Sequence, residues 1–139
     1  SSGAGWTFGF GAGDNNFNIY RGSSCKVWID ETNGDYHAIS DRRLKKNIEP
    51  IKYGLQEVLK MQPSNYTFIS DSLNKPQLGF IAQDLYTVIP EAVKVGGINP
   101  ETNPWGLNSS AIIPVLVKAI QEQQVQIEEL KKEIEALKR

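Results

Sequence analysis

The chain of 139 residues has a mass of 15.5 kDa, which allows one ordinary domain or a small domain with an appendage and excludes two large domains. Fifteen basic and sixteen acidic residues give a net charge of -1, so we expect no nucleic-acid partner, and without a run of eighteen apolar residues we expect no membrane span. The single cysteine, Cys25, and the single histidine predict no internal disulfide, no metal site within one chain and no cofactor. Ser1 to Gly13 lacks the features of a signal peptide, and we interpret the chain as a fragment of a longer protein.

Residues 1–39 alternate apolar and polar side chains, which is typical of short β-strands. The alternation predicts strands at Trp6 to Phe10, Phe17 to Tyr20 and Lys26 to Ile29, joined by turns at Gly11 to Asn16 and Thr32 to Asp35. Two or three such hairpins bury too little area to fold alone. We therefore interpret residues 1–39 as the end of a larger β-structured protein, or as strands that partner chains complete.

The composition changes at Ser40, and residues 40–110 are expected to form a small α+β unit. A basic segment opens it and a loop from Gly96 to Ser110 closes it. Between them the pattern predicts a helix from Pro50 to Met61, a strand at Tyr66 to Ile69, a turn at Asp71 to Pro76, a strand at Leu78 to Ile81, a helix from Ala82 to Val88 and a strand at Val93 to Val95.

Residues 111–139 predict one long helix with a heptad repeat. Isoleucine recurs at position a, and leucine with one glutamine occupies position d; the residues are Ile113, Ile120, Ile127 and Ile134 at a, and Leu116, Gln123, Leu130 and Leu137 at d. This pattern favours a coiled coil between copies of the chain, and the choice of Ile at a with Leu at d by itself favours two strands. The alternative is a single helix that packs its stripe on its own domain.

Ser40 and Lys45 have the spacing of a candidate nucleophile and base. A lysine acts as a base only when it is uncharged, and the neighbouring positive charges of Arg42, Arg43 and Lys46 favour that form if packing also removes water. Alternatively, Ser40 and Asp41 only start a helical turn and the basic residues are solvated. His37, three residues before Ser40, could also form a Ser/His pair, although its place in a predicted strand favours a surface or interface role.

Four ordered motifs carry a resemblance that covers about residues 40 to 139. They are Ser40 to Ile48 (SDRRLKKNI), Gly79 to Asp84 (GFIAQD), Pro90 to Val93 (PEAV) and Ile113 to Glu122 (IPVLVKAIQE) before the heptads. Together they resemble the C-terminal intramolecular chaperone domain of phage tail fibres and tail spikes, including endosialidase tailspikes, and of phage neck appendages.

The resemblance implies an intertwined homotrimer that folds the upstream fibre or spike of the same polypeptide and then cuts itself off by autoproteolysis between Ile39 and Ser40. It assigns Ser40 as the nucleophile and Lys45 as the general base of a serine-lysine dyad, a serine endopeptidase that acts once. Gln83 and Asp84 become candidates for positioning or domain integrity, the alternative for Gln83 being a buried amide that caps a loop. The fibre portion, residues 1–39, would belong to the virion tail, and the chaperone core (40–110) and helix (111–139) would be released in the host cytoplasm.

Two other functions stay open at this point. One is a structural trimerisation cap that is never cleaved, with Ser40 only a turn residue. The other is an adhesin whose glycine-rich and aromatic residues 1–39 bind a host receptor. The family also implies three strands where the heptad pattern favours two.

Overall fold

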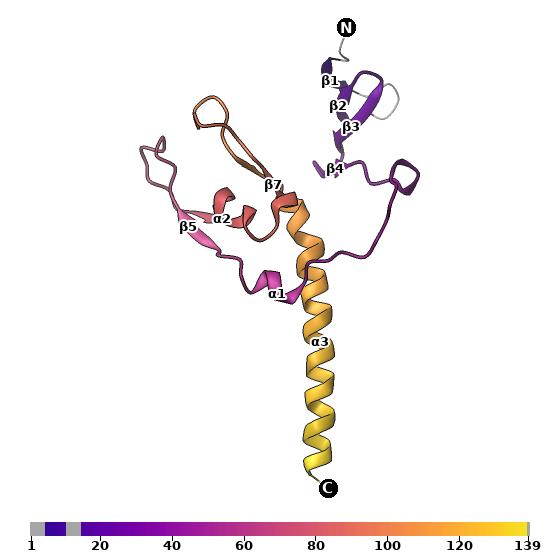
Figure 1. Cartoon of the computed structure of the whole chain (residues 1–139). Helices are drawn as coiled ribbons and strands as arrows, with labels where there is room; N and C mark the ends of the chain where they lie inside the picture. The colour runs from indigo at the N-terminus through magenta and orange to yellow at the C-terminus, as the bar shows by residue number, and fades with distance from the viewer. Residues whose placement is uncertain (1–4, 11–14, 139) are drawn as a thin grey trace. The chain divides into compact units, whose positions relative to one another are not determined.

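The computed structural model describes residues 5–10 and 15–138, which form an α+β structure (Figure 1). Two compact units divide the chain, residues 1–49 and residues 50–139. The predicted combination of N-terminal strands, a small α+β unit and a long final helix is confirmed. Most of the turn predicted at Gly11 to Asn16 lies outside the described residues.

The first unit contains a four-stranded antiparallel sheet in the order β1-β2-β3-β4. Its strands are β1 (Trp6–Phe10), β2 (Phe17–Arg21), β3 (Ser24–Ile29) and β4 (Tyr36–Ala38), which confirms the first three predicted strands and the strand expected at His37. Gly22 and Gly34 have φ angles of 60° and 76°, and glycine adopts this left-handed conformation without steric cost in the two hairpin turns.

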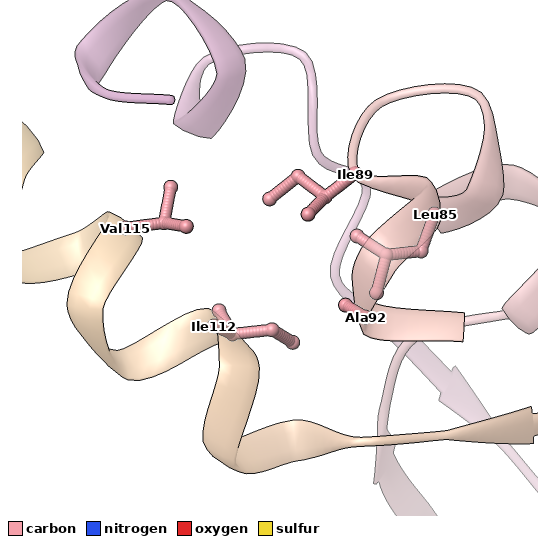
Figure 2. Packing of buried hydrophobic residues seen from close by; sticks show 5 residues of the cluster. All are labelled: Leu85, Ile89, Ala92, Ile112 and Val115. Carbon is pink, nitrogen blue, oxygen red and sulfur yellow. The ribbon is translucent and has the colours of Figure 1, made fainter. Parts of the chain in front are cut away.

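The second unit is built around one small apolar core (Figure 2). Helix α2 (Ala82–Tyr86) and the 3-10 turn η2 (Pro90–Ala92) provide Leu85, Ile89 and Ala92 on one side. Helix α3 (Ile112–Leu137) provides Ile112 and Val115 on the other, and Figure 2 shows these two side chains pointing toward the first three. The core therefore fixes α3 to the α2 segment by its first turns alone.

Two short hairpins complete this unit (Figure 1). Strand β5 (Ser64–Tyr66) pairs with β6 (Gln77–Gly79), and β7 (Val93–Lys94) pairs with β8 (Gly106–Leu107). The 3-10 turn η3 (Ser109–Ala111) leads from β8 into α3.

The helix predicted from Pro50 to Met61 is wrong in its first half, because α1 spans only Leu55–Val58. The side chains of Ile51 and Tyr53 pack against the core from non-helical backbone, and the four-residue spacing of Ile51 and Leu55 imitated a helical stripe. The helix begins after Gly54, whose N–H donates to the Glu57 carboxylate at 3.0 Å and so closes the first turn.

Three predictions for residues 66–110 also need correction. Both strands of the first hairpin begin earlier than expected: Tyr66 to Ile69 was predicted where β5 spans Ser64–Tyr66, and Leu78 to Ile81 where β6 spans Gln77–Gly79. The first strand ends early because Asp71 N–H donates to the Phe68 carbonyl and the chain turns there. The predicted loop of residues 96–110 contains β8 and η3. Asn108 N–H donates to the Ala92 carbonyl at 2.8 Å, a contact between distant residues that no local pattern signals.

Helix α3 confirms the predicted long helix and uses a different face on its own domain from the heptad stripe. Ile112, Val115 and Ala119 are buried, whereas Ile113, at the first a position, is 60% exposed. The other apolar a and d residues are 41% to 86% exposed: Leu116, Ile120, Ile127, Leu130, Ile134 and Leu137. The alternative that the stripe packs on its own domain is therefore wrong.

Candidate active site at residues 39–45

Residues 41–45 form a single 3-10 turn that Asp41 caps. The turn η1 spans Arg42–Leu44, and the Asp41 carboxylate accepts a hydrogen bond from Arg43 N–H at 2.8 Å. Lys45 N–H donates to the Arg42 carbonyl at 3.1 Å, which closes the turn. As the alternative to a nucleophile and base, the sequence predicted a helical turn started by Ser40 and Asp41, and the backbone does form such a turn.

The same turn brings Lys45 back to Ser40. The Lys45 Nζ donates to the Ser40 Oγ at 2.7 Å, and both residues are exposed in the single chain. An amine at hydrogen-bond distance from a hydroxyl is the geometry that a serine nucleophile and its base require. The turn η1 and a candidate pair of Ser40 and Lys45 are therefore compatible, because the turn places the two side chains at hydrogen-bond distance.

Asp41 also engages the side chain of Arg43. The guanidinium donates from Nε to both carboxylate oxygens, at 3.0 and 3.1 Å, and from Nη2 to Oδ2. These hydrogen bonds lower the pKa of the Asp41 carboxyl below its usual value and raise the pKa of Arg43. The charge of Arg43 is thus compensated locally, whereas none of the ion pairs between described residues involves Arg42 or Lys46.

The candidate scissile bond follows strand β4 directly. Ile39 N–H donates to the Lys26 carbonyl at 3.4 Å, which continues the pairing of β4 with β3 by one residue. The Ile39 side chain is 39% exposed. The peptide between Ile39 and Ser40 therefore lies between a paired strand end and the capped turn.

His37 lies in β4 and stacks on Trp28 of β3, with ring centroids 5.0 Å apart and an interplanar angle of 14°. Within the described part of the chain, no hydrogen bond joins His37 to Ser40. This environment supports the surface or interface role for His37. No signal in the sequence indicated that Trp28 would stack on His37 or that the Lys26 carbonyl would bind Ile39 N–H. Both contacts arise from the register in which β3 pairs with β4.

Gln83 and Asp84 lie on α2 in the second unit, and both are exposed. The prediction that Gln83 could be a buried amide is wrong for the single chain. Gln83 instead borders an open groove with a largely apolar lining that includes Phe68 and Trp105. The backbone carbonyl of Asp84 accepts a hydrogen bond from the Thr87 hydroxyl at 2.7 Å, which stabilises the end of α2.

Other kinds of site have little support in the residues that the structure describes. No group of three or more His, Cys, Asp or Glu side chains there could hold a metal ion. None of the helices there is long and apolar enough to cross a membrane.

Residues 40–94 match the family model of the chaperone of endosialidase, and the model bears the name of a peptidase family. The match begins at Ser40. The chain therefore carries a chaperone domain of the endosialidase type, which confirms the resemblance that the four motifs indicated.

Curated relatives with similar sequences are phage proteins. The long tail fiber protein Gp37 of Enterobacteria phage M1 is 36% identical over 105 residues, covering 70% of this chain and 40% of that protein, and the protein of phage Ox2 gives the same values. Gp37 of phage T2 is 31% identical over 98 residues, covering 68% of this chain and 7% of that protein. The chain thus spans less than half the length of these relatives, and it is similar to one part of these tail fiber proteins.

Proposed function

We propose that this chain is the intramolecular chaperone and adjoining fibre end of a phage tail fibre, and that it assembles as a homotrimer and cuts itself between Ile39 and Ser40. The observation that carries the proposal is the 2.7 Å contact between Lys45 Nζ and Ser40 Oγ at the first residue of the family match. The fibre portion would stay in the virion tail with the upstream fibre of the same polypeptide. The chaperone portion would be released in the host cytoplasm.

The chemistry is an acyl shift followed by hydrolysis. Lys45, in its uncharged form, removes the hydroxyl proton as Ser40 Oγ attacks the carbonyl carbon of Ile39. The tetrahedral intermediate collapses by breaking the bond to the Ser40 nitrogen, which takes the proton back from Lys45 and leaves an ester between Ile39 and Ser40 Oγ. Water then hydrolyses this ester, which yields the Ile39 carboxylate and restores the serine hydroxyl.

Exposure of the dyad supports a link between cleavage and assembly. In the single chain Ser40 and Lys45 are both exposed, whereas a lysine acts as a base where packing removes water from it. Neighbouring copies that cover residues 40–46 would remove water and favour the uncharged amine, as would the charges of Arg42 and Lys46. Cleavage would then wait until the copies have assembled.

The exposed heptad stripe of α3 supports association of copies. Its apolar a and d side chains face solvent along the helix, and beyond residue 122 every described residue of α3 is exposed. An isolated helical segment of this length is marginal in water, so burial against other helices is needed to stabilise it. The heptad pattern alone favours two strands, and three are proposed here because the resemblance to the chaperone family implies them.

The pairing of β4 supports a further condition for cleavage. Because Ile39 is tied to the Lys26 carbonyl, the carbonyl that Ser40 attacks has a fixed position only when β4 is paired with β3. Cleavage would therefore follow the folding of the fibre end, and the product would be held by its barrier to unfolding.

Intact mass of the freshly expressed chain under denaturing conditions tests the dyad. We expect two fragments that join at Ile39-Ser40 in the wild type and one full-length chain in Ser40→Ala and in Lys45→Ala. Lys46→Ala is the matched control: it removes an adjacent lysine of the same charge, and the loss of that charge should slow cleavage without abolishing it.

Sedimentation of the same samples tests the oligomeric state. A wild-type chain that forms trimers but stays full length would refute self-cleavage and leave the rival function, a retained trimerisation cap. A wild-type chain that remains monomeric at micromolar concentration would refute the proposed assembly.

A further inference from the structure

The sheet of the first unit has two faces of different chemistry. Strand register places Trp6, Phe8 and Phe10 of β1 on the same face as their partners on β2. The large apolar residues of this side, which we name the aromatic face, are Trp6, Phe8, Phe10, Phe17, Ile19, Val27, Ile29 and Tyr36, and register also places Arg21, Ser24 and Ala38 on this side. The opposite face carries more polar residues: Thr7, Gly9, Asn18, Tyr20, Cys25, Trp28 and His37.

The aromatic face is largely uncovered, unlike the opposite one. Trp6, Phe8, Phe10 and Tyr36 are 64%, 79%, 81% and 64% exposed. On the opposite face Asn18 is only 3% exposed, and the rings of Trp28 and His37 cover each other. An antiparallel sheet normally packs its apolar face on a second layer and turns its polar face to water. In this sheet the aromatic face, which should pack against a second layer, is the face that is exposed.

We infer that the aromatic face is the surface through which the sheets of two or more copies of this chain pack on one another around a common axis. The inference deepens the proposed homotrimer and rests on it. It assigns the inward-facing side of each sheet, with Phe8 at the contact and Thr7 directed outward.

The area of the face fits a second copy. A buried aromatic side chain covers about 150–250 Å². At the observed exposures the four most exposed rings and the partly exposed Phe17 and Ile29 offer roughly 600 Å² of apolar surface per chain. A stable interface buries about 800 Å² per partner, so the face supplies most of the required area.

The composition of the face also favours a copy of itself over a partner of different chemistry. Among the described residues that strand register places on this side, the charged one is Arg21, whose guanidinium lies 6.0 Å from the centroid of the Trp6 ring. The remaining side chains are aromatic or aliphatic and complement the same set on another chain. The exposed stripe of α3 independently calls for other copies of this chain, and it would bring the sheets together at high local concentration.

Cysteine cross-linking of the full chain tests the inference. The background carries Ser40→Ala, so that the sheet and α3 stay joined, and Cys25→Ser, so that no other thiol is present. Phe8→Cys places a thiol on the aromatic face, and Thr7→Cys, the matched control, places one at the adjacent exposed position of the opposite face. After mild oxidation with copper phenanthroline, chains are separated under denaturing, non-reducing conditions.

We expect up to two thirds of the Phe8→Cys chains to run as covalent dimers, because two of three thiols around a three-fold axis can pair, and less than a tenth of the Thr7→Cys chains. Equal cross-linking of the two variants, or none in Phe8→Cys, would overturn the inference. Sedimentation separates this failure from that of the proposed function: Phe8→Cys chains that assemble but are not cross-linked refute the sheet contact alone, and monomers of the background chain, Ser40→Ala with Cys25→Ser, refute both. If Phe8→Cys does not assemble, Tyr36→Cys on the same face decides by the same criterion.

Discussion

The contact between α1 and α3 depends on the absence of a side chain at position 54. Leu55 N–H donates to the Glu122 carboxylate of α3 at 2.8 Å, across 67 residues of sequence. A Cβ at Gly54 would lie 2.7 Å from Glu122 Oε1 and 2.8 Å from its Cδ, closer than non-bonded carbon atoms allow. Gly54→Ala should therefore push the carboxylate away and break its hydrogen bond to Leu55.

The expected loss is about 1–2 kcal/mol of unfolding free energy. A hydrogen bond to a charged group is worth about 1.5–3 kcal/mol, and the Glu122 side chain is 38% exposed, which reduces this value through solvent screening. Moving the end of a flexible glutamate costs little in itself, so most of the loss comes from the unpaired Leu55 N–H. Alanine at the residue before a helix adds a few tenths of a kcal/mol relative to glycine.

Thermal unfolding followed by circular dichroism measures this loss. The variants are made in the Ser40→Ala chain and compared at one protein concentration, because assembly makes the melting temperature concentration-dependent. For a unit of about 90 residues, 1–2 kcal/mol corresponds to a decrease of roughly 5–15 °C.

A double-mutant cycle with Glu122→Ala provides the decisive comparison. Without the carboxylate there is nothing for the new Cβ to displace, so Gly54→Ala should cost only a few tenths of a kcal/mol in that background. Losses that add fully in the double variant would refute the idea that the glycine acts through Glu122.

Three further predictions concern the active site and the core. His37→Ala should slow cleavage by less than about tenfold, because an aromatic stack on Trp28 is worth about 0.5–1.5 kcal/mol, and a loss above a hundredfold in single-turnover assays would instead make His37 a catalytic base. Asp41→Asn keeps a cap acceptor and should cleave at nearly the wild-type rate, whereas Asp41→Ala should be several-fold slower through loss of a cap worth about 1 kcal/mol; equal rates would exclude a role for the cap. The Tyr53 hydroxyl donates to Glu91 at 2.6 Å and lowers the pKa of that carboxyl from 4.5, so its stabilisation is present above pH 4.5 and is lost as the pH falls through the lower folded-state pKa. The difference in melting temperature between wild type and Tyr53→Phe should therefore shrink as the pH is lowered below 4.5, and a constant difference would contradict this.

Local patterns in the sequence were sufficient for the elements that local physics determines. Alternation predicted β1, β2 and β3, since side chains in a strand point alternately to the two faces. The heptads predicted α3, and the five-residue spacing of Ser40 and Lys45 allowed the contact that the η1 turn makes. For the dyad, spacing alone was weak evidence, and the four motifs together identified the family.

The errors arose where contacts between distant residues decide the structure. Ile51 and Tyr53 pack on the core from non-helical backbone, and only the approach of Glu122 to Gly54 shows why α1 starts so late. Strand β8 exists because it pairs with β7, which the loop-like composition of residues 96–110 conceals. The same holds at the cleavage site, where the Lys26 carbonyl tethers Ile39 through register alone.

Helix α3 carries its inner and outer apolar stripes on the same turns. The buried residues Ile112 and Val115 are each followed directly by an outer stripe residue, so the two stripes stand about 100° apart around the helix axis. The outer stripe is the heptad stripe, which would form the axis of a coiled coil. Because α3 is continuous from Ile112 to Leu137, the helix itself sets the direction in which each domain projects from that axis. One residue inserted after Ile120 would rotate the heptads that follow it by about 100° relative to the domain. Because α3 is one continuous helix, this rotation would not be compensated within it.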